Sequence, residues 1–157
     1  MLKEIERKYL VINDSWRKEV ESSIHMSQAY IRTALGRVTV RVRIAGDCAW
    51  LTLKGPSSGI SRDEYEYEIP VDEAEQIIST LCDTNVISKV RHIVLHDSRL
   101  WEVDEYDDRN TGLVVAELEV SSETEEYSIP PWLGDEVSHD RRYSNGSLAV
   151  TPYSEWK

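Results

Sequence analysis

Charged residues that alternate with apolar ones are the feature of this sequence most able to do chemistry. The chain opens MLKEIERKYLV, in which Glu4, Glu6 and Lys8 occupy every second position. Because successive side chains of a β-strand point to opposite faces, these three would share one face of a strand. A solvated strand face is the simplest explanation of this segment alone, so the other segments must decide whether it belongs to a site.

The same alternation recurs along the chain, and every segment that shows it has one charged face. It predicts strands at residues 4–11, 26–33, 38–45, 48–54, 62–69, 86–95, 100–107 and 113–121. The charged faces carry eight acids, which are Glu4, Glu6, Glu64, Glu66, Glu102, Asp104, Glu117 and Glu119. They also carry eight bases, which are Lys8, Arg32, Arg41, Arg43, Lys54, Arg62, Lys89 and Arg91.

An antiparallel sheet with one wet side would explain each of these strands taken singly. Two features favour a site instead. The charges are sorted by strand rather than mixed with neutral polar residues, and most of the bases are arginines, whose planar guanidinium suits phosphate. A single pair such as Glu117 and Glu119 is explained equally well by ordinary cross-strand ion pairing. The whole set is not, because so many like charges on one face would repel one another without a ligand.

Carboxylates and bases gathered in one place indicate a metal–phosphate site. Carboxylates without His or Cys among them select hard cations such as Mg²⁺ or Mn²⁺, and Arg and Lys select phosphate. Together they would hold divalent ions that bridge phosphoryl oxygens while the bases neutralise the remaining charge. The histidines fall off these faces or in loops, and we expect structural or exposed roles for His25, His92, His96 and His139.

The overall charge narrows the partners that the protein can take. The chain has 157 residues, 40% of them hydrophobic and 30% charged, which is typical of a globular protein with one domain over residues 1–157. Its net charge is −11 and the charged faces balance, so the ten remaining bases and 21 remaining acids make the outer surface acidic. Such a surface repels nucleic acid and anionic membranes, whereas a small enclosed anion remains a suitable partner.

Other features of the sequence predict the cell compartment and the remaining elements. There is no apolar run of about 20 residues and no secretory h-region, so we expect a cytoplasmic protein. Cys48 and Cys82 are expected to be buried free thiols. Helices are predicted at 14–22 and 71–81, with shorter ones at 131–133 and 145–150. Mostly hairpin connections then indicate an α+β domain, mainly antiparallel β, that is open or closed into a barrel.

Over essentially its whole length the chain resembles the CYTH superfamily, also called the triphosphate tunnel metalloenzymes. Its members include class IV adenylyl cyclases, thiamine triphosphatases, bacterial inorganic triphosphatases and, more remotely, fungal RNA triphosphatases. Residues 4–8 have the ExExK form of that family, which is a weak signal alone and a strong one in order with the others. The other matching segments are Gln28-Ala29-Tyr30, residues 39–43, 51–54 and 62–66, Lys89-Val90-Arg91, residues 101–104, Glu117-Leu118-Glu119 and Arg142-Tyr143-Ser144-Asn145.

The resemblance implies an eight-stranded closed barrel with helices packed outside and the charged faces lining a tunnel. By similarity, Glu4, Glu6 and Glu117 would hold a first divalent ion. Glu119, Asp104 and either Glu64 or Glu66 would hold a second ion or orient water. The triphosphate would be bound by Lys8, Arg41, Arg43, Lys54, Arg62, Lys89 and Arg91, and the residues expected to act in catalysis are Lys8, Glu4, Glu6, Glu119 and Lys89.

The activity that the resemblance implies is Mg²⁺- or Mn²⁺-dependent hydrolysis of inorganic triphosphate to pyrophosphate and phosphate. Nucleoside triphosphates or short polyphosphate would use the same residues. A class IV-type adenylyl cyclase is one alternative, and it requires the substrate to lie in another register. A non-catalytic polyphosphate- or organic-phosphate-binding domain is another, although a pure binder needs only the bases. A monomer and a homodimer are both compatible with the sequence.

Overall fold

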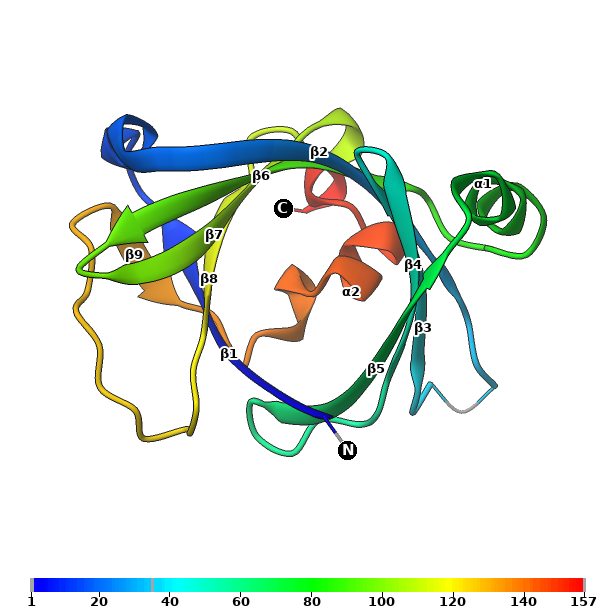
Figure 1. Ribbon diagram of the computed structural model, residues 1–157, viewed down its shortest axis with the longest axis horizontal. Helices are drawn as coiled ribbons and strands as arrows, with labels where there is room; N and C mark the ends of the chain where they lie inside the picture. Colours follow the sequence, from blue (N-terminus) through cyan, green and yellow to red (C-terminus); the bar gives the residue numbers. More distant parts are fainter. Residues whose placement is uncertain (1, 35, 157) are drawn as a thin grey trace.

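Antiparallel strands close into a barrel in the computed structural model, which describes residues 2–34 and 36–156 (Figure 1). The eight strands of the wall are β1 (Leu2–Val11), β2 (Val20–Ile31), β3 (Thr39–Ala45), β4 (Cys48–Lys54), β5 (Ser61–Ile69), β6 (Ile87–His96), β7 (Arg99–Tyr106) and β8 (Val114–Glu119). Their order around the barrel is β1-β5-β4-β3-β2-β6-β7-β8, and β8 pairs with β1 again. This confirms the closed antiparallel barrel.

Strand β1 closes the barrel by pairing on both of its edges. On one edge residues 6–10 pair with β8. On the other edge residues 2–5 pair with β5, and Tyr9 and Val11 pair with a short strand, β9 (Leu133–Glu136). Because β5 leaves β1 after Ile5, β9 satisfies backbone groups that would otherwise form an open edge.

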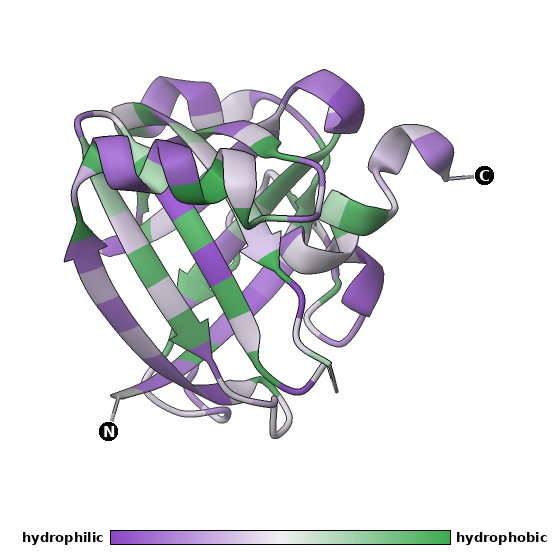
Figure 2. Cartoon of the chain, turned by 90° about the vertical axis from the view of Figure 1, so that its right-hand side faces the viewer, coloured by the Kyte–Doolittle hydropathy of each residue, from purple (hydrophilic) through white to green (hydrophobic). Residues whose placement is uncertain are grey.

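The apolar faces of the wall point outward, where helices and loops cover them. Apolar and polar residues alternate along the strands (Figure 2). Helix α1 (Val71–Thr80) lies outside the barrel beside β3 and β4 (Figure 1), and its Ala74 clusters with Val42 and Ala49. The alternation therefore leaves the inner faces of the strands for polar side chains.

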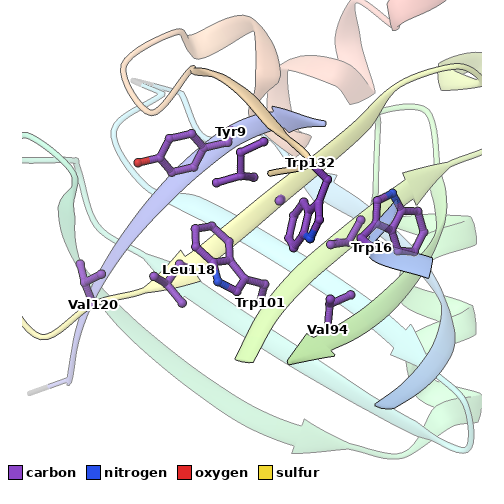
Figure 3. Packing of buried hydrophobic residues seen from close by; sticks show 10 residues of the cluster. Tyr9, Trp16, Val94, Trp101, Leu118, Val120 and Trp132 are labelled. Carbon is purple, nitrogen blue, oxygen red and sulfur yellow. The ribbon is translucent and has the colours of Figure 1, made fainter. Parts of the chain in front are cut away.

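A second apolar cluster covers the outside of β6, β7 and β8 and is rich in aromatic rings (Figure 3). Trp101 lies edge-on to Tyr9 and to Trp132, with ring centroids 5.9 and 5.8 Å apart. Trp16, in the 3₁₀ helix η1 (Ser15–Glu19), is 1% exposed. Edge-to-face aromatic pairs contribute about 0.5–1.5 kcal/mol beyond the area they bury. The cluster thus fixes strands β1, β7 and β8, which carry most of the inward-facing acids.

The C-terminal segment forms the third apolar cluster. Helix α2 (Asn145–Val150) buries Leu148 and Ala149 against Tyr30, Ile87 and residues of β7 and β8. In the view of Figure 1, α2 lies across the opening of the barrel. The remaining 3₁₀ helices are η2 (Asp108–Asn110), η3 (Arg141–Tyr143) and η4 (Tyr153–Glu155). The helices at 71–80 and 145–150 confirm two of the four that the sequence predicted.

Two predicted helices are wrong. The segment 14–22 is helical only over Ser15–Glu19, and β2 begins at Val20, because residues 20–28 pair with residues 87–94 of β6. The predicted short helix at 131–133 is a turn that leads into β9 at Leu133. In both places strand pairing along a neighbouring edge overrides local helix signals.

The two cysteines form no disulfide with each other, as expected, but their expected burial is wrong for Cys48. Cys48 is exposed because it begins β4 directly after the turn that follows β3, and Cys82 is half-buried. Within residues 2–34 and 36–156, no helix is long and apolar enough to span a membrane.

Candidate active site

Two cavities share Glu4, Glu6 and Lys54, and one of them is lined by polar residues throughout. The main cavity has a volume of about 270 Å³, and every residue that lines it is polar. It is lined by Glu4, Glu6, Arg41, Arg43, Lys54, Glu64, Glu66, Arg91, Glu102, Glu117, Glu119 and Asn145. The second cavity has a volume of about 150 Å³. It is lined by Glu4, Glu6, Lys8, Lys54, Ser57, Gly59, Ile60, Arg62, Val137, Ser138, Asp140, Arg141 and Ser144.

Most of the residues that the sequence places on charged faces meet in these two cavities. Of the sixteen charged-face residues, eleven line the main cavity, and Lys8 and Arg62 line the second. The three exceptions are Lys89, Asp104 and Arg32. Lys89 and Asp104 are buried and line neither cavity. Arg32 follows the end of β2 and pairs on the surface with Asp83, so its placement on an inner face is wrong.

The carboxyl groups of the main cavity stand in two hydrogen-bonded pairs. Burial alone would raise the pKa of Glu4, but a hydrogen bond from Glu64 and the charge of Lys54, 2.8 Å away, hold that pKa at about 2. Burial and the same hydrogen bond raise the pKa of Glu64 to about 7. Near pH 7 Glu4 is therefore ionised and Glu64 is about half protonated.

Glu6 and Glu117 behave in the same way across β1 and β8. Burial, followed by the charge of Glu117, raises the pKa of Glu6 well above its ordinary value. Burial would also raise the pKa of Glu117, but the charge of Lys8 and a hydrogen bond from Glu6 hold it well below its ordinary value. Carboxyl groups this crowded need a proton or a cation between them.

This donor set fits a hard divalent cation, because it consists of carboxylate oxygens without His or Cys. In the part of the chain that the structure describes, no three acidic side chains already converge as a chelating group. Shared protons and Lys54 hold the carboxylates instead.

Asp104 is the anchor of two buried bases. Its carboxylate accepts hydrogen bonds from Lys89 Nζ at 2.7 Å and from Arg91 Nε and Nη2 at 2.8 and 2.9 Å. Burial would raise the pKa of Asp104, but the charges of Lys89 and Arg91 outweigh it and hold that pKa at about 2. Burial lowers the pKa of Lys89 to about 7. Both carboxylate oxygens are thus engaged, and their effect is to aim the guanidinium of Arg91 into the main cavity.

The other two arginines of the main cavity are each held by a neutral polar residue, and Arg41 is held by a carboxylate as well. Arg41 donates to Thr52 Oγ1 at 3.2 Å and to Glu66 at 3.4 Å. Arg43 donates to Gln28 Oε1 at 2.8 Å and has no carboxylate partner among the described residues. Gln28 and Thr52 share the inner faces of their strands, so alternation could have marked them as supports of the arginines.

Among the described residues that line the main cavity, Asn145 is the one that sequence reasoning did not place on a charged face, and Glu102 was placed there without a role in the site. Its Oδ1 accepts hydrogen bonds from Tyr106 Oη at 2.7 Å and from Lys89 Nζ at 3.3 Å. It begins helix α2, so these bonds fasten the C-terminal segment over the tunnel. The only signal was its place in the segment 142–145, which matched the family.

The histidines lie away from the cavities. His92 contacts Ser23 and Glu105 and packs against Trp16 on the outside of the wall. His25 is exposed and bonds Ser88. Their positions agree with the structural or exposed roles expected for them.

The chain forms a closed antiparallel barrel whose interior is lined by paired acids and bases, and this combination is the basis for comparing it with known proteins. The chain matches the CYTH domain over residues 2–153 and belongs to that family. It is 44% identical over 157 residues to an inorganic triphosphatase of Acetivibrio thermocellus, covering 100% of this chain and 99% of the relative.

Two further similarities agree with this family. An inorganic triphosphatase of Nitrosomonas europaea is 32% identical over 151 residues, which cover 94% of this chain and 97% of the relative. The crystal structure of an inorganic triphosphatase superposes with a TM-score of 0.69 at 31% identity, covering 96% of each chain.

Proposed function

We propose that this protein hydrolyses inorganic triphosphate to pyrophosphate and phosphate with the help of Mg²⁺ or Mn²⁺. The observation that carries the proposal is the main cavity, in which seven carboxylates and four bases face one another inside a closed barrel. Relatives of 44% and 32% identity are both inorganic triphosphatases, which supports it. The acidic outer surface further supports action in the cytoplasm on a small anion rather than on nucleic acid or a membrane.

Under this proposal the carboxylates divide between two divalent ions. Glu4, Glu6 and Glu117 would hold a first ion, which would replace the proton between Glu6 and Glu117, and Glu119 with Glu64 or Glu66 would hold a second. Such an ion, when bound, polarises phosphoryl oxygens and lowers the pKa of water to near neutrality. Glu119 would orient the attacking water and accept its proton, because it is the most exposed of these acids on β8.

The bases bind and neutralise the phosphate oxygens. Arg41, Arg43 and Arg91 point into the main cavity, and preorganised guanidinium groups there stabilise charge that develops on the leaving oxygens. Lys54, which pairs with Glu4 and Glu64, would turn to the substrate once those carboxylates bind metal. Lys89 and Asp104 would position Arg91 rather than make the direct substrate and metal contacts that the resemblance implied, and their buried ion pairs support this role.

The lining of the main cavity favours inorganic triphosphate over the alternatives. No aromatic or apolar side chain among the described residues lines it, so nothing is present to stack on a nucleobase. The adenylyl cyclase alternative needs such a contact. The non-catalytic alternative does not explain seven carboxylates, because a pure phosphate binder needs only the bases.

The proposal is tested by incubating the purified protein with Mg²⁺ or Mn²⁺ and, separately, with tripolyphosphate, ATP, GTP or thiamine triphosphate. We expect phosphate release, fastest from tripolyphosphate. Formation of cyclic AMP from ATP would instead identify a cyclase. Binding of tripolyphosphate without turnover would identify a phosphate-binding domain.

A further inference from the structure

Lys8 and Arg62 of the second cavity form no ion pair with any acid of the described residues, although Lys8 lies opposite Glu117 where β1 pairs with β8. In the main cavity Arg41, Lys54 and Arg91 each pair with a carboxylate, and Arg43 bonds the neutral Gln28. In the second cavity, by contrast, Lys8 donates to the carbonyl oxygen of Tyr143 at 3.1 Å, and Arg62 donates to the carbonyl of Gly55 at 3.2 Å. Partly buried bases that bond only neutral acceptors favour an anionic ligand beside them.

Arg141 is a third base of the second cavity, and it comes from the C-terminal segment rather than from the barrel wall. It lies in η3 and is exposed, and its side chain forms no hydrogen bond or ion pair with any residue that the structure describes. Lys8 donates to the backbone carbonyl of Tyr143, the last residue of η3, so β1 holds η3 beside the cavity. The guanidinium of Arg141 therefore lines the same cavity as Lys8 and Arg62 without an acidic partner among the described residues.

The neighbouring arginine shows why Arg141 is available. Arg142 pairs with Asp140 at 2.7 Å, and its guanidinium lies over the ring of Trp156, 5.0 Å from its centroid. Asp140 is the acid of the second cavity that is not shared with the main cavity, and Arg142 neutralises it. Arg141 consequently keeps its full charge for a ligand.

We propose that Arg141 binds substrate, contacting, with Lys8 and Arg62, the terminal phosphate of a triphosphate that extends from the main cavity into the second. This inference rests on the proposed function and adds to it a residue from outside the barrel wall. The shared residues Glu4, Glu6 and Lys54 make the two cavities neighbours along such a chain of phosphates. A shorter ion such as pyrophosphate fits within the main cavity alone and needs Arg141 less.

The experiment compares Arg141→Ala and Arg141→Lys with Arg37→Ala, which removes an exposed arginine outside both cavities. Turnover of tripolyphosphate with Mg²⁺ is measured first. We expect Arg141→Ala to raise KM for tripolyphosphate about 10- to 100-fold, the cost of losing charged hydrogen bonds. We expect kcat to stay within about twofold, Arg141→Lys to restore much of the affinity, and Arg37→Ala to resemble wild type.

Equilibrium titration with tripolyphosphate and pyrophosphate, without divalent ions, separates this inference from the proposed function. We expect Arg141→Ala to lose affinity for tripolyphosphate and to keep its affinity for pyrophosphate. The inference would be overturned if Arg141→Ala bound tripolyphosphate as tightly as wild type, or if it lost the same factor of affinity for tripolyphosphate and for pyrophosphate. If metal-free binding is too weak to measure, an unchanged KM of Arg141→Ala for tripolyphosphate would overturn it. A wild type that binds tripolyphosphate, loses that binding in Arg141→Ala and never hydrolyses it would instead overturn the proposed function. A wild type that neither binds nor hydrolyses would overturn both.

Discussion

Single residues of the main cavity are coupled through shared protons. The pKa of Glu6 is raised well above its ordinary value beside Glu117, whose pKa is held well below it, and the pKa of Glu64 is raised to about 7 beside Glu4, whose pKa is held at about 2. Two carboxyl groups in contact cannot both ionise at low cost, so one pKa rises as the other falls. A divalent ion relieves the same repulsion while both carboxylates stay ionised. Whether both carboxyl groups of a pair are ionised therefore depends on whether a proton or a divalent ion lies between them.

Glu6→Gln tests the metal-binding part of this arrangement. The amide can donate to Glu117 the hydrogen bond that protonated Glu6 donates, so the free energy of unfolding should stay within about 0.5 kcal/mol of wild type. Turnover of tripolyphosphate should fall about 100-fold or more, because transition-state stabilisation of several kcal/mol from the ion is lost. Urea denaturation and phosphate release measure the two quantities. Glu68→Gln, which changes an exposed acid of β5 outside both cavities, is the control, and retained turnover in Glu6→Gln would refute the metal assignment.

Asp104→Ala tests whether this carboxylate is an anchor for bases. The substitution removes the carboxylate partner of buried Lys89 and one partner of Arg91, which keeps Glu102 and Glu117, and breaking a buried pair in this way costs about 3–5 kcal/mol of folding free energy. Glu102→Gln is the matched control, because its ion pair with Arg91 is 40% exposed on the acid side and should contribute less than about 1 kcal/mol. Urea denaturation in metal-free buffer gives both values. An Asp104→Ala variant as stable as wild type would mean that the carboxylate is free to serve as a metal ligand.

The sequence predicted which residues face inward better than it predicted how deep they lie. Alternation gives the direction of a strand side chain, so Glu4, Arg41 and Glu117 could be assigned to one space. It does not give the distance between side chains, so the ion pair that engages Lys89 and Asp104 was not foreseen. These contacts depend on pairing between β6 and β7, which places Arg91 opposite Asp104.

At the scale of elements, the C-terminal segment completes the site that the barrel wall begins. Helix α2 reaches the main cavity through Asn145, and η3 reaches the second cavity through Arg141. The N-cap of α2 is Ser144, whose hydroxyl accepts from the backbone of Ser147 at 3.1 Å. Two short helices that would be marginal alone are thus held by contacts with the barrel.

Asn145→Ala tests how firmly α2 is fastened. Tyr106 is buried and would lose the acceptor of its hydroxyl, which should cost about 1–2 kcal/mol of folding free energy. The amides of Leu148 and Ala149 should also exchange faster with solvent. Ser154→Ala is the control, because Ser154 is exposed. Unchanged stability and exchange in Asn145→Ala would show that the apolar contacts of Leu148 hold the helix by themselves.

Element prediction failed where a distant edge decided the outcome. The segment 14–22 has local helix signals, but its second half extends β2 along β6, about 70 residues away in sequence. Strand β9 exists because β5 leaves half of one edge of β1 unpaired. Neither partner is visible in a local window, whereas the helix at 71–80 has its own apolar face and was predicted correctly.

At the scale of the whole molecule, apolar packing lies outside the barrel and charge lies inside it. The three apolar clusters cover the outer wall and one end, and the interior is stabilised by ion pairs and hydrogen bonds. Buried charges provide groups that bind a charged ligand, but they lower the stability of the fold because charges are costly to bury. Binding a charged ligand should therefore stabilise the fold.

Tripolyphosphate without divalent ions should raise the melting temperature of the protein. A ligand at 100 times its Kd adds about 2.7 kcal/mol to the free energy of unfolding. Scanning calorimetry with increasing tripolyphosphate measures the effect, and sulfate at the same ionic strength is the control for non-specific salt. Equal shifts with the two anions would contradict a tunnel built for triphosphate.

The most direct test of metal-dependent triphosphate hydrolysis in the tunnel is a product count. Purified wild type and Glu117→Gln are incubated with tripolyphosphate and Mg²⁺ or Mn²⁺, with and without a chelator, and both products are quantified. The expected result is one phosphate and one pyrophosphate per tripolyphosphate for wild type with metal. We expect almost none with the chelator or for Glu117→Gln. Undiminished hydrolysis with the chelator or by Glu117→Gln would contradict metal-dependent hydrolysis in the tunnel. So would the absence of hydrolysis by wild type with Mg²⁺ or Mn²⁺.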